Sequence, residues 1–299
     1  MHGEHHEGPD ARDLGILSVA VLGASSAPPL MAAIAAPALA IAFWRNVMAL
    51  PVAVPMALWQ RRSDHRRLTL RTTVVIVFAA SMLGTHFASM ASALDRTTVA
   101  SAATLVCSQS IWAALFASVL GQRLTRAAWI GTVIAFAGVV VVTGADAVLS
   151  PGSVVGNALA LAAGAAGGAY MVAGGVVRRT VSTSVYTALC YGCCALLLAV
   201  ALVLAGQPFT GYPPSAWIQL VALTVLAQLV GHSLFNLVMR SVSASFVSLA
   251  QLMTVPLAMV IAAVLLGETP RPAVLPGAAL MMAGIAVVLT AHRRVGAKP

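Results

Sequence analysis

Three ionisable side chains lie within long apolar stretches of the sequence: Arg45, His86 and His232. A charged group inside hydrocarbon costs on the order of 2.5–3.5 kcal/mol, so such residues in a membrane-spanning segment usually mark a binding site or a pathway. Arginine presents a planar fork of donors that matches a carboxylate, and histidine changes its charge near neutral pH. We therefore predict that Arg45 binds an anionic group of a solute, and that His86 and His232 act as polar contacts or proton-sensitive gates.

A structural interpretation of these three residues stays open. A rise of 1.5 Å per residue places Arg45 about 10 Å below the outer end of its apolar stretch, so its long side chain could instead reach the membrane interface. Each histidine could serve only as a hydrogen bond between helices. The acidic residues offer no competing site within the membrane, because all eight fall in tails, in loops or at the ends of apolar stretches. They are Glu4, Glu7, Asp10, Asp13, Asp64, Asp95, Asp146 and Glu268.

Neutral polar and aromatic side chains near these residues are candidates for the lining of a pathway. A few polar groups that converge in an apolar cavity suit an amphipathic organic solute, although amide side chains also hold membrane helices together. The candidates are Trp44, Gln109, Trp112, Tyr170, Tyr191, Asn236 and Gln251.

Three prolines inside apolar stretches are predicted to bend the helices that carry them. Pro28 and Pro29 are consecutive, and Pro256 lies near the other end of the chain. Proline removes a backbone donor and clashes with the preceding turn, so it kinks or breaks a helix. These positions are candidates for hinges, and a static kink that only fits packing is the alternative.

The composition identifies the environment that must hold these residues. Of 299 residues, 60% are hydrophobic and only 8% are charged, with a formal net charge of +9. A soluble domain carries about 25% charged residues. The sequence therefore predicts an all-α integral membrane protein and excludes a soluble enzyme, a disordered chain, a disulfide scaffold and a nucleic-acid binder.

Ten apolar stretches are long enough to cross a bilayer, which needs about 20 residues per helix. If the N-terminus is cytoplasmic, 14 of the 17 Lys and Arg residues fall on the inside, which is the bias that orients membrane proteins. Both termini are then predicted to be cytoplasmic, in a multi-pass protein of the cell (plasma or inner) membrane. The stretches are 14–33, 38–59, 72–93, 98–119, 127–144, 154–176, 183–205, 214–237, 242–265 and 273–291.

The two halves of the chain align when one is shifted by 146 residues. Gly121-Gln122 then falls on Gly267-Glu268, and His86 falls on His232. Five spans per half make the second half enter the membrane from the opposite side, which is the inverted repeat of many alternating-access transporters. We predict a cytoplasmic tail at 1–13, repeats at 14–145 and 154–291, and a second cytoplasmic tail at 292–299.

The repeated motif resembles a known family. The Gly121-Gln122-Arg123-Leu124-Thr125 turn is followed by Trp129, Gly131 and Gly138, and its second copy Gly267-Glu268-Thr269 is followed by Gly277 and Gly284. With Ala42-Phe43-Trp44-Arg45, this is similar to the EamA family of the drug/metabolite transporter superfamily. The resemblance implies ten helices in two inverted five-helix repeats, a central cavity, and outward movement of small metabolites such as amino acids. Gln122 and Ser110 depart from the acidic residue and the proline that the family shares.

The sequence thus predicts a secondary transporter that exports a small organic metabolite such as an amino acid by alternating access. A broad-specificity efflux carrier for lipophilic compounds is the alternative. An integral membrane enzyme acting on lipids is a remote one, since no HExxH or GxSxG motif occurs. The expected partners are a small-molecule substrate and the lipid bilayer, and no oligomeric state is predicted.

No cofactor and no metal are predicted. No phosphate-binding loop occurs, so transport would draw on a solute or ion gradient. Cys190 and Cys193 are interpreted as packing residues in a membrane helix, and the histidines of the N-terminal tail have no fixed geometry for a metal.

Overall fold

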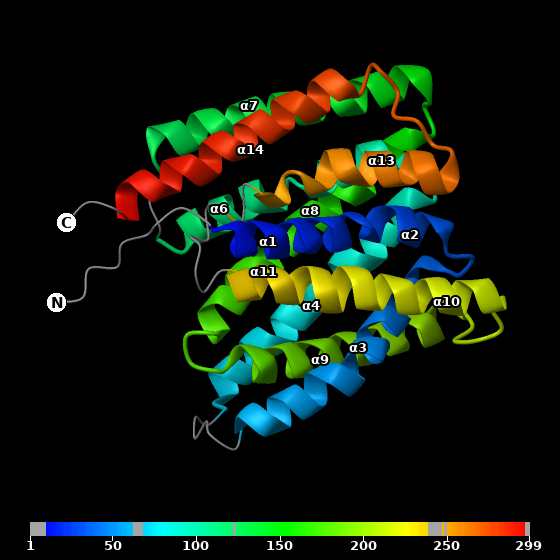
Figure 1. Cartoon of the computed structure of the whole chain (residues 1–299), viewed down its shortest axis with the longest axis vertical. Coiled ribbons are helices and arrows are strands. Elements are labelled where there is room, and N and C mark those ends of the chain that lie inside the picture. The colour runs from blue at the N-terminus through cyan, green and yellow to red at the C-terminus, as the bar shows by residue number, and fades with distance from the viewer. Residues whose placement is uncertain (1–9, 62–67, 122–123, 239–246, 248–249, 297–299) are drawn as a thin grey trace.

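The computed structural model describes residues 10–61, 68–121, 124–238, 247 and 250–296, and within these residues every regular element is helical (Figure 1). The elements are α1 Ala11–Ser25, α2 Ala27–Ala33, α3 Ala38–Arg61, α4 Leu70–Leu94, α5 Val99–Val106, α6 Gln109–Val119, α7 Arg126–Leu149, α8 Ser153–Val177, α9 Thr183–Leu204, α10 Pro214–Ala222, the π-helical segment η1 Leu223–Gly231, α11 His232–Val238, α13 Thr254–Leu266 and α14 Leu275–Gly296.

The helices have the length and the surface of membrane spans. Eight of the helical segments in the described part of the chain are long and apolar enough to cross a bilayer, and Thr254–Leu266 and Leu275–Thr290 are shorter apolar helices. Large aliphatic side chains cover the outside of the bundle, such as Val140 and Val264, which are 70% and 79% exposed. Such a surface would aggregate in water, so the prediction of an all-helical membrane protein is confirmed.

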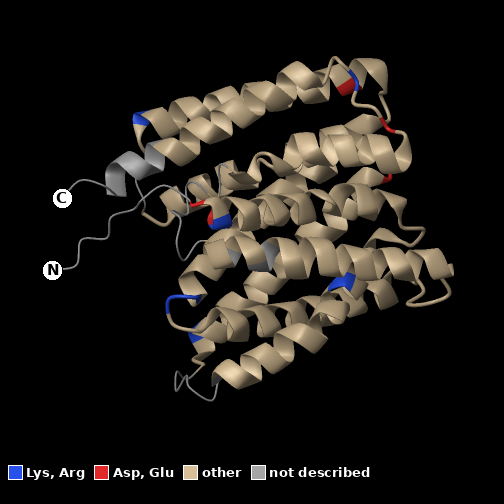
Figure 2. Ribbon diagram, viewed as in Figure 1, with Lys and Arg blue, Asp and Glu red and all other residues tan. Residues whose placement is uncertain are grey.

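Polar caps start several of these helices. Thr69, Thr98 and Thr125 each accept a hydrogen bond from the backbone N–H three residues later, at 3.1–3.2 Å. These bonds satisfy donors that the first turn of a helix leaves without a partner. Figure 2 shows the charged residues gathered mostly at the ends of the helices, as expected when their middles lie in hydrocarbon.

Helix pairs from the two halves of the chain build the bundle. α3 packs against α9, α4 against α8, α1 against η1, and α7 against α14. In Figure 1, α7 and α14 lie side by side at one edge of the bundle, and α3 and α9 lie at the opposite edge. The partners are far apart in sequence, so neither half forms a separate bundle.

The packing of α7 on α14 brings the two copies of the glycine motif into contact. A Cβ atom added at Gly131 would lie 2.6 Å from the carbonyl oxygen of Gly284, and one at Gly138 would lie 2.6 Å from that of Gly277. The higher-numbered glycine of α7 thus meets the lower-numbered glycine of α14, so these two helices run antiparallel. Only glycine allows the backbones to approach this closely.

Candidate functional site

Arg45 lies inside the protein at a junction of four elements. Its side chain is 3% exposed and comes from α3. Its Nε donates a hydrogen bond of 2.9 Å to Oε1 of Gln228 on η1, and one Nη lies 3.6 Å from Sδ of Met31 on α2. The guanidinium carbon lies 3.7 Å from the ring centroid of Phe87 on α4, a cation–π contact.

These contacts leave the positive charge of Arg45 without an anion. No carboxylate pairs with Arg45 among the residues that the structure describes. Because Arg45 Nε can only donate, Gln228 must turn its oxygen toward it, and its buried Nε2 group makes no hydrogen bond of standard geometry among the described residues, although Tyr191 lies beside Gln228. A guanidinium and an amide N–H₂ group, both donors, are what an anionic group would bind.

His86 lies next to this junction. It adjoins Phe87 on α4, and the two rings lie 5.1 Å apart. Its Nδ1 lies 2.8 Å from the carbonyl oxygen of Ala163 on α8, and a carbonyl only accepts, so Nδ1 carries the proton. The side chain of Gln109 lies close to that of His86, because both contact Gly167 of α8. A Cβ atom added at Gly167 would lie 2.7 Å from Oε1 of Gln109 and 2.9 Å from Nδ1 of His86.

The tyrosines share a cluster with Phe87, whereas the tryptophans lie elsewhere. Tyr170 and Tyr191 pack against the cluster of buried side chains that includes Phe87. Trp44 donates from Nε1 to the carbonyl oxygen of Phe209 at 2.7 Å, so its polar group is held by the loop before α10. Trp112 packs in a separate aromatic group with rings of α6 and α7.

The remaining polar candidates are only partly described. The side chains of His232 and Asn236 lie outside the described residues, although both residues belong to α11. Gln251 is half-buried and precedes α13, where its backbone carbonyl accepts a hydrogen bond of 2.6 Å from Thr254 Oγ1. Gln251 therefore lies just before the break that precedes α13, and its amide has no described contact with Arg45.

The predicted proline positions adjoin interruptions of the helices. α1 ends at Ser25, and Pro28 and Pro29 lie in the first turn of α2, where a missing N–H costs nothing. Ser26 Oγ donates to the carbonyl oxygen of Gly23 at 2.7 Å. Pro256 occupies the first turn of α13 in the same way.

The partners of Arg45 are the functional candidates that the sequence reasoning missed. Gln228, Met31 and Phe87 bind the guanidinium, and none of them was among the predicted lining residues. Gln228 carries a recognisable signal, since it is an amide within the apolar stretch 214–237. Methionine and phenylalanine are ordinary membrane residues, and only the packing identifies these two.

Comparisons with known proteins agree with this architecture. Residues 13–144 and 154–290 each match the EamA-like transporter family. No curated protein matches the chain. A solved crystal structure, described only as that of a protein, aligns with a TM-score of 0.63 and 23% sequence identity, over 95% of this chain and 99% of that chain. At this identity the likeness shows a shared fold.

Proposed function

Because this chain belongs to the EamA-like transporter family, whose members are membrane transporters of the drug/metabolite transporter superfamily, we propose that it is a secondary transporter of a small organic metabolite that carries an anionic group, such as an amino acid. The transported solute binds at Arg45, and its carboxylate takes the place of the anion that the buried guanidinium lacks. Gln228 supplies a second donor from the opposite half of the chain.

The observation that carries this proposal is the buried charge of Arg45, which no carboxylate among the described residues neutralises. A charge held away from water is costly unless it is paired, and the Oε1 atom of Gln228 and the ring of Phe87 compensate only part of that cost. A binding site for an anion gives the charge a partner during transport. The contacts reach Arg45 from α2, α4 and η1, so relative movement of these elements would change access to the site.

We further propose ten spans in two inverted repeats, with alternating access to the site and both termini in the cytoplasm of a plasma or inner membrane. The antiparallel contact of the equivalent helices α7 and α14 supports this arrangement. In an inverted repeat, one half can close toward one side while the other opens toward the opposite side.

The test is flux into proteoliposomes that contain the purified protein. The panel comprises amino acids, other carboxylates and lipophilic cations, each with and without a pH gradient and in both directions. We expect saturable flux of at least one carboxylate-bearing solute. Arg45→Ala should weaken its apparent affinity by about 10- to 100-fold, the range for a lost hydrogen bond to a charged group. Arg96→Ala, at an exposed helix end, is the control.

Two outcomes would contradict the proposal. Unchanged affinity for the anionic solute in the Arg45→Ala protein would remove the binding role of Arg45. Flux restricted to lipophilic cations would favour the broad efflux carrier. Arg45→Lys keeps the charge but loses the fork that bonds Gln228, so we expect an affinity between those of the wild-type and Ala proteins.

A further inference from the structure

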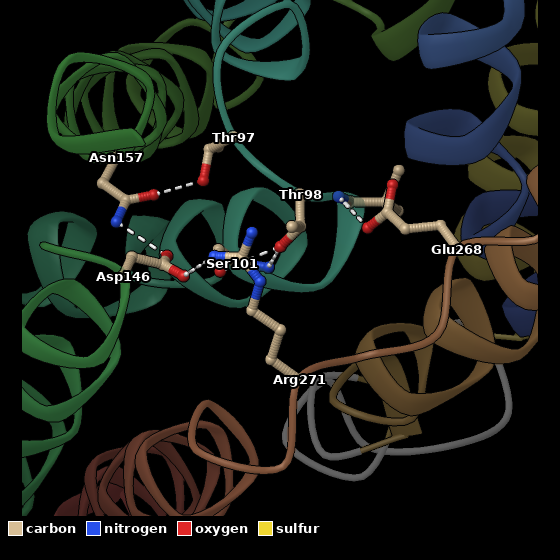
Figure 3. A network of polar contacts seen from close by, with 8 residues as sticks. Thr97, Thr98, Ser101, Asp146, Asn157, Glu268 and Arg271 are labelled. Carbon is tan, nitrogen blue, oxygen red and sulfur yellow. Dashed lines mark hydrogen bonds and ion pairs between the residues drawn. The ribbon is translucent and has the colours of Figure 1, made fainter. Parts of the chain in front are cut away.

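A polar network joins the two halves of the chain at the end of the bundle opposite the first turn of α1 and the last turn of α14 (Figures 1 and 3). It is built from the connection between α4 and α5, the last turn of α7, the first turns of α8, and the connection between α13 and α14. Its members are Thr97, Val99, Asp146, Asn157, Glu268 and Arg271.

Asp146 is the centre of this network. Its carboxylate is completely buried, accepts a hydrogen bond of 2.9 Å from Nδ2 of Asn157, and lies 3.6 Å from a guanidinium nitrogen of Arg271. Asn157 in turn accepts a hydrogen bond of 2.7 Å from Thr97 Oγ1. One buried carboxylate of the first half is therefore held by an amide and a cation of the second half.

Glu268 adds a second connection between the halves. Its Oε1 accepts a hydrogen bond of 2.7 Å from the backbone N–H of Val99, the first residue of α5. A carboxylate at this position satisfies an unpaired donor and complements the positive end of the helix. Gly156 brings the backbones close, since a Cβ atom there would lie 2.8 Å from Cβ of Thr97.

The sequence does not repeat this acid–base pair in the other copy. A shift of 146 residues places Gln122 at the position of Glu268, Thr125 at that of Arg271, and His292 at that of Asp146. Asn157 corresponds to Ala11. The acid–base pair thus occurs in only one of the two copies, although the helices around it are repeated.

From these contacts between the halves we propose that Asp146, Asn157, Glu268 and Arg271 form an ionic latch that closes the outer end of the transporter. The inference rests on the proposed function, because a latch of this kind acts in an alternating-access cycle. The latch holds the α4–α5 connection against the first turns of α8 and against the α13–α14 connection, and these parts must separate when the outer end opens. Because these contacts must break when the outer end opens, they favour the outward-closed arrangement in the absence of substrate.

The first test measures hydrogen–deuterium exchange of the reconstituted protein without substrate. Asp146→Asn and Arg271→Gln should raise the exchange rate of peptides from 95–99 and 267–274 by about tenfold, since each removes one partner of a pair whose carboxylate is buried. Arg96→Gln is the matched control, because Arg96 lies in the same connection and its described side-chain hydrogen bond is local, to the carbonyl oxygen of Ser92 in the last turn of α4. Equal exchange in all three variants and the wild-type protein would overturn the latch.

A second test locks the same end. Thr97→Cys with Asn157→Cys brings together two side chains that are in hydrogen-bond contact, and oxidation should form a disulfide that abolishes flux, with recovery on reduction. Each single cysteine variant is the control. Full flux through the cross-linked protein would show that this end does not open.

The two readouts separate the latch from the proposed function. If the wild-type protein moves no solute of the panel but the latch variants raise exchange, the transport proposal fails, whereas the contacts that hold this end closed are supported. If solutes are moved and exchange is unaffected, the latch fails and the transport proposal stands.

Discussion

At the scale of single residues, the balance of charge around Arg45 decides what the site can bind. Taking a guanidinium out of water costs several kcal/mol after relaxation. One hydrogen bond to Gln228 and the face of Phe87 offset part of this cost. The remaining positive potential favours an anion over a cation, which agrees with the absence of acidic residues from the middles of the apolar stretches in the sequence.

The role of Gln228 gives a prediction at this scale. Gln228→Glu would place a carboxylate beside the guanidinium and supply the missing anion from within the protein. We expect the affinity for anionic solutes to fall by at least about tenfold, while the melting temperature in detergent is maintained or raised. Equilibrium binding of a labelled substrate and thermal unfolding measure the two effects.

Gln219→Glu is the control for this substitution, because Gln219 lies on α10, nine residues earlier in the same stretch. It introduces the same charge without touching Arg45. Unchanged substrate affinity in the Gln228→Glu protein would show that the guanidinium does not hold the anion.

At the scale of elements, interrupted helices surround the site. Gln228 lies on η1, and π-helical segments are rare and are frequently found at functional sites. α1 lies directly on this segment, since a Cβ atom added at Gly23 would lie 2.6 Å from the carbonyl oxygen of Leu226. The sequence predicted a kink at Pro28 and Pro29, and the break at Ser26 separates α1 from α2, which carries Met31. A hinge there would move Met31 relative to Arg45, and that role stays a prediction.

The contact of α7 with α14 gives the prediction at the scale of elements. Gly131→Ala would force the two backbones apart, because the new methyl group would lie 2.6 Å from the carbonyl oxygen of Gly284. We expect a loss of about 1–3 kcal/mol in the free energy of unfolding, typical of overpacking. Thermal or chemical unfolding in detergent measures it.

Gly144→Ala is the matched control on the same helix. No other atom lies within 4 Å of a Cβ atom at Gly144, and alanine favours a helix by about 0.8–1.0 kcal/mol over glycine in water. Gly144→Ala should therefore be neutral or stabilising. Equal losses in both variants would mean that the close contact is not what Gly131 provides.

At the scale of the whole molecule, the two halves of the chain repeat their helix contacts as well as their sequence. α4 belongs to the third span of the first half and packs on α8, the first span of the second half. In the same way, η1 belongs to the third span of the second half and packs on α1, in the first span of the first half. Gly121 and Gly267 are equivalent in the repeat, and both adopt a positive φ, of 94° and 67°. The glycine that opens the motif is therefore required by the same backbone turn in both halves.

The orientation in the membrane gives the prediction at this scale. The connection at Gly152 should face the outside and that at Arg179 the cytoplasm, because the basic residues gather at the latter end. In intact cells, a membrane-impermeant maleimide should label Gly152→Cys, and it should label Arg179→Cys only after permeabilisation. The reverse pattern would refute a cytoplasmic N-terminus and with it the outer location of the latch.

The membrane environment, the helical class and the family could all be predicted from the amino-acid sequence. Hydrophobic length and composition are properties of short stretches, and the glycine motif repeats at a constant offset, so all three can be read without knowing any contact. Family membership is confirmed by the match to 13–144 and 154–290. The count of ten spans, the inverted orientation and the direction of transport stay predictions.

The surroundings of each polar side chain could not be predicted in this way, because they depend on the packing of the folded chain. Arg45 and Gln228 are 183 residues apart in the chain, and Val99 and Glu268 are 169 apart. Trp44 is adjacent to Arg45 in the sequence, yet its Nε1 group donates to the loop before α10 and not into the Arg45 site. Such pairs depend on how whole helices rotate and pack against one another, because a helix turns each successive side chain by about 100° and only its neighbours decide which face is buried.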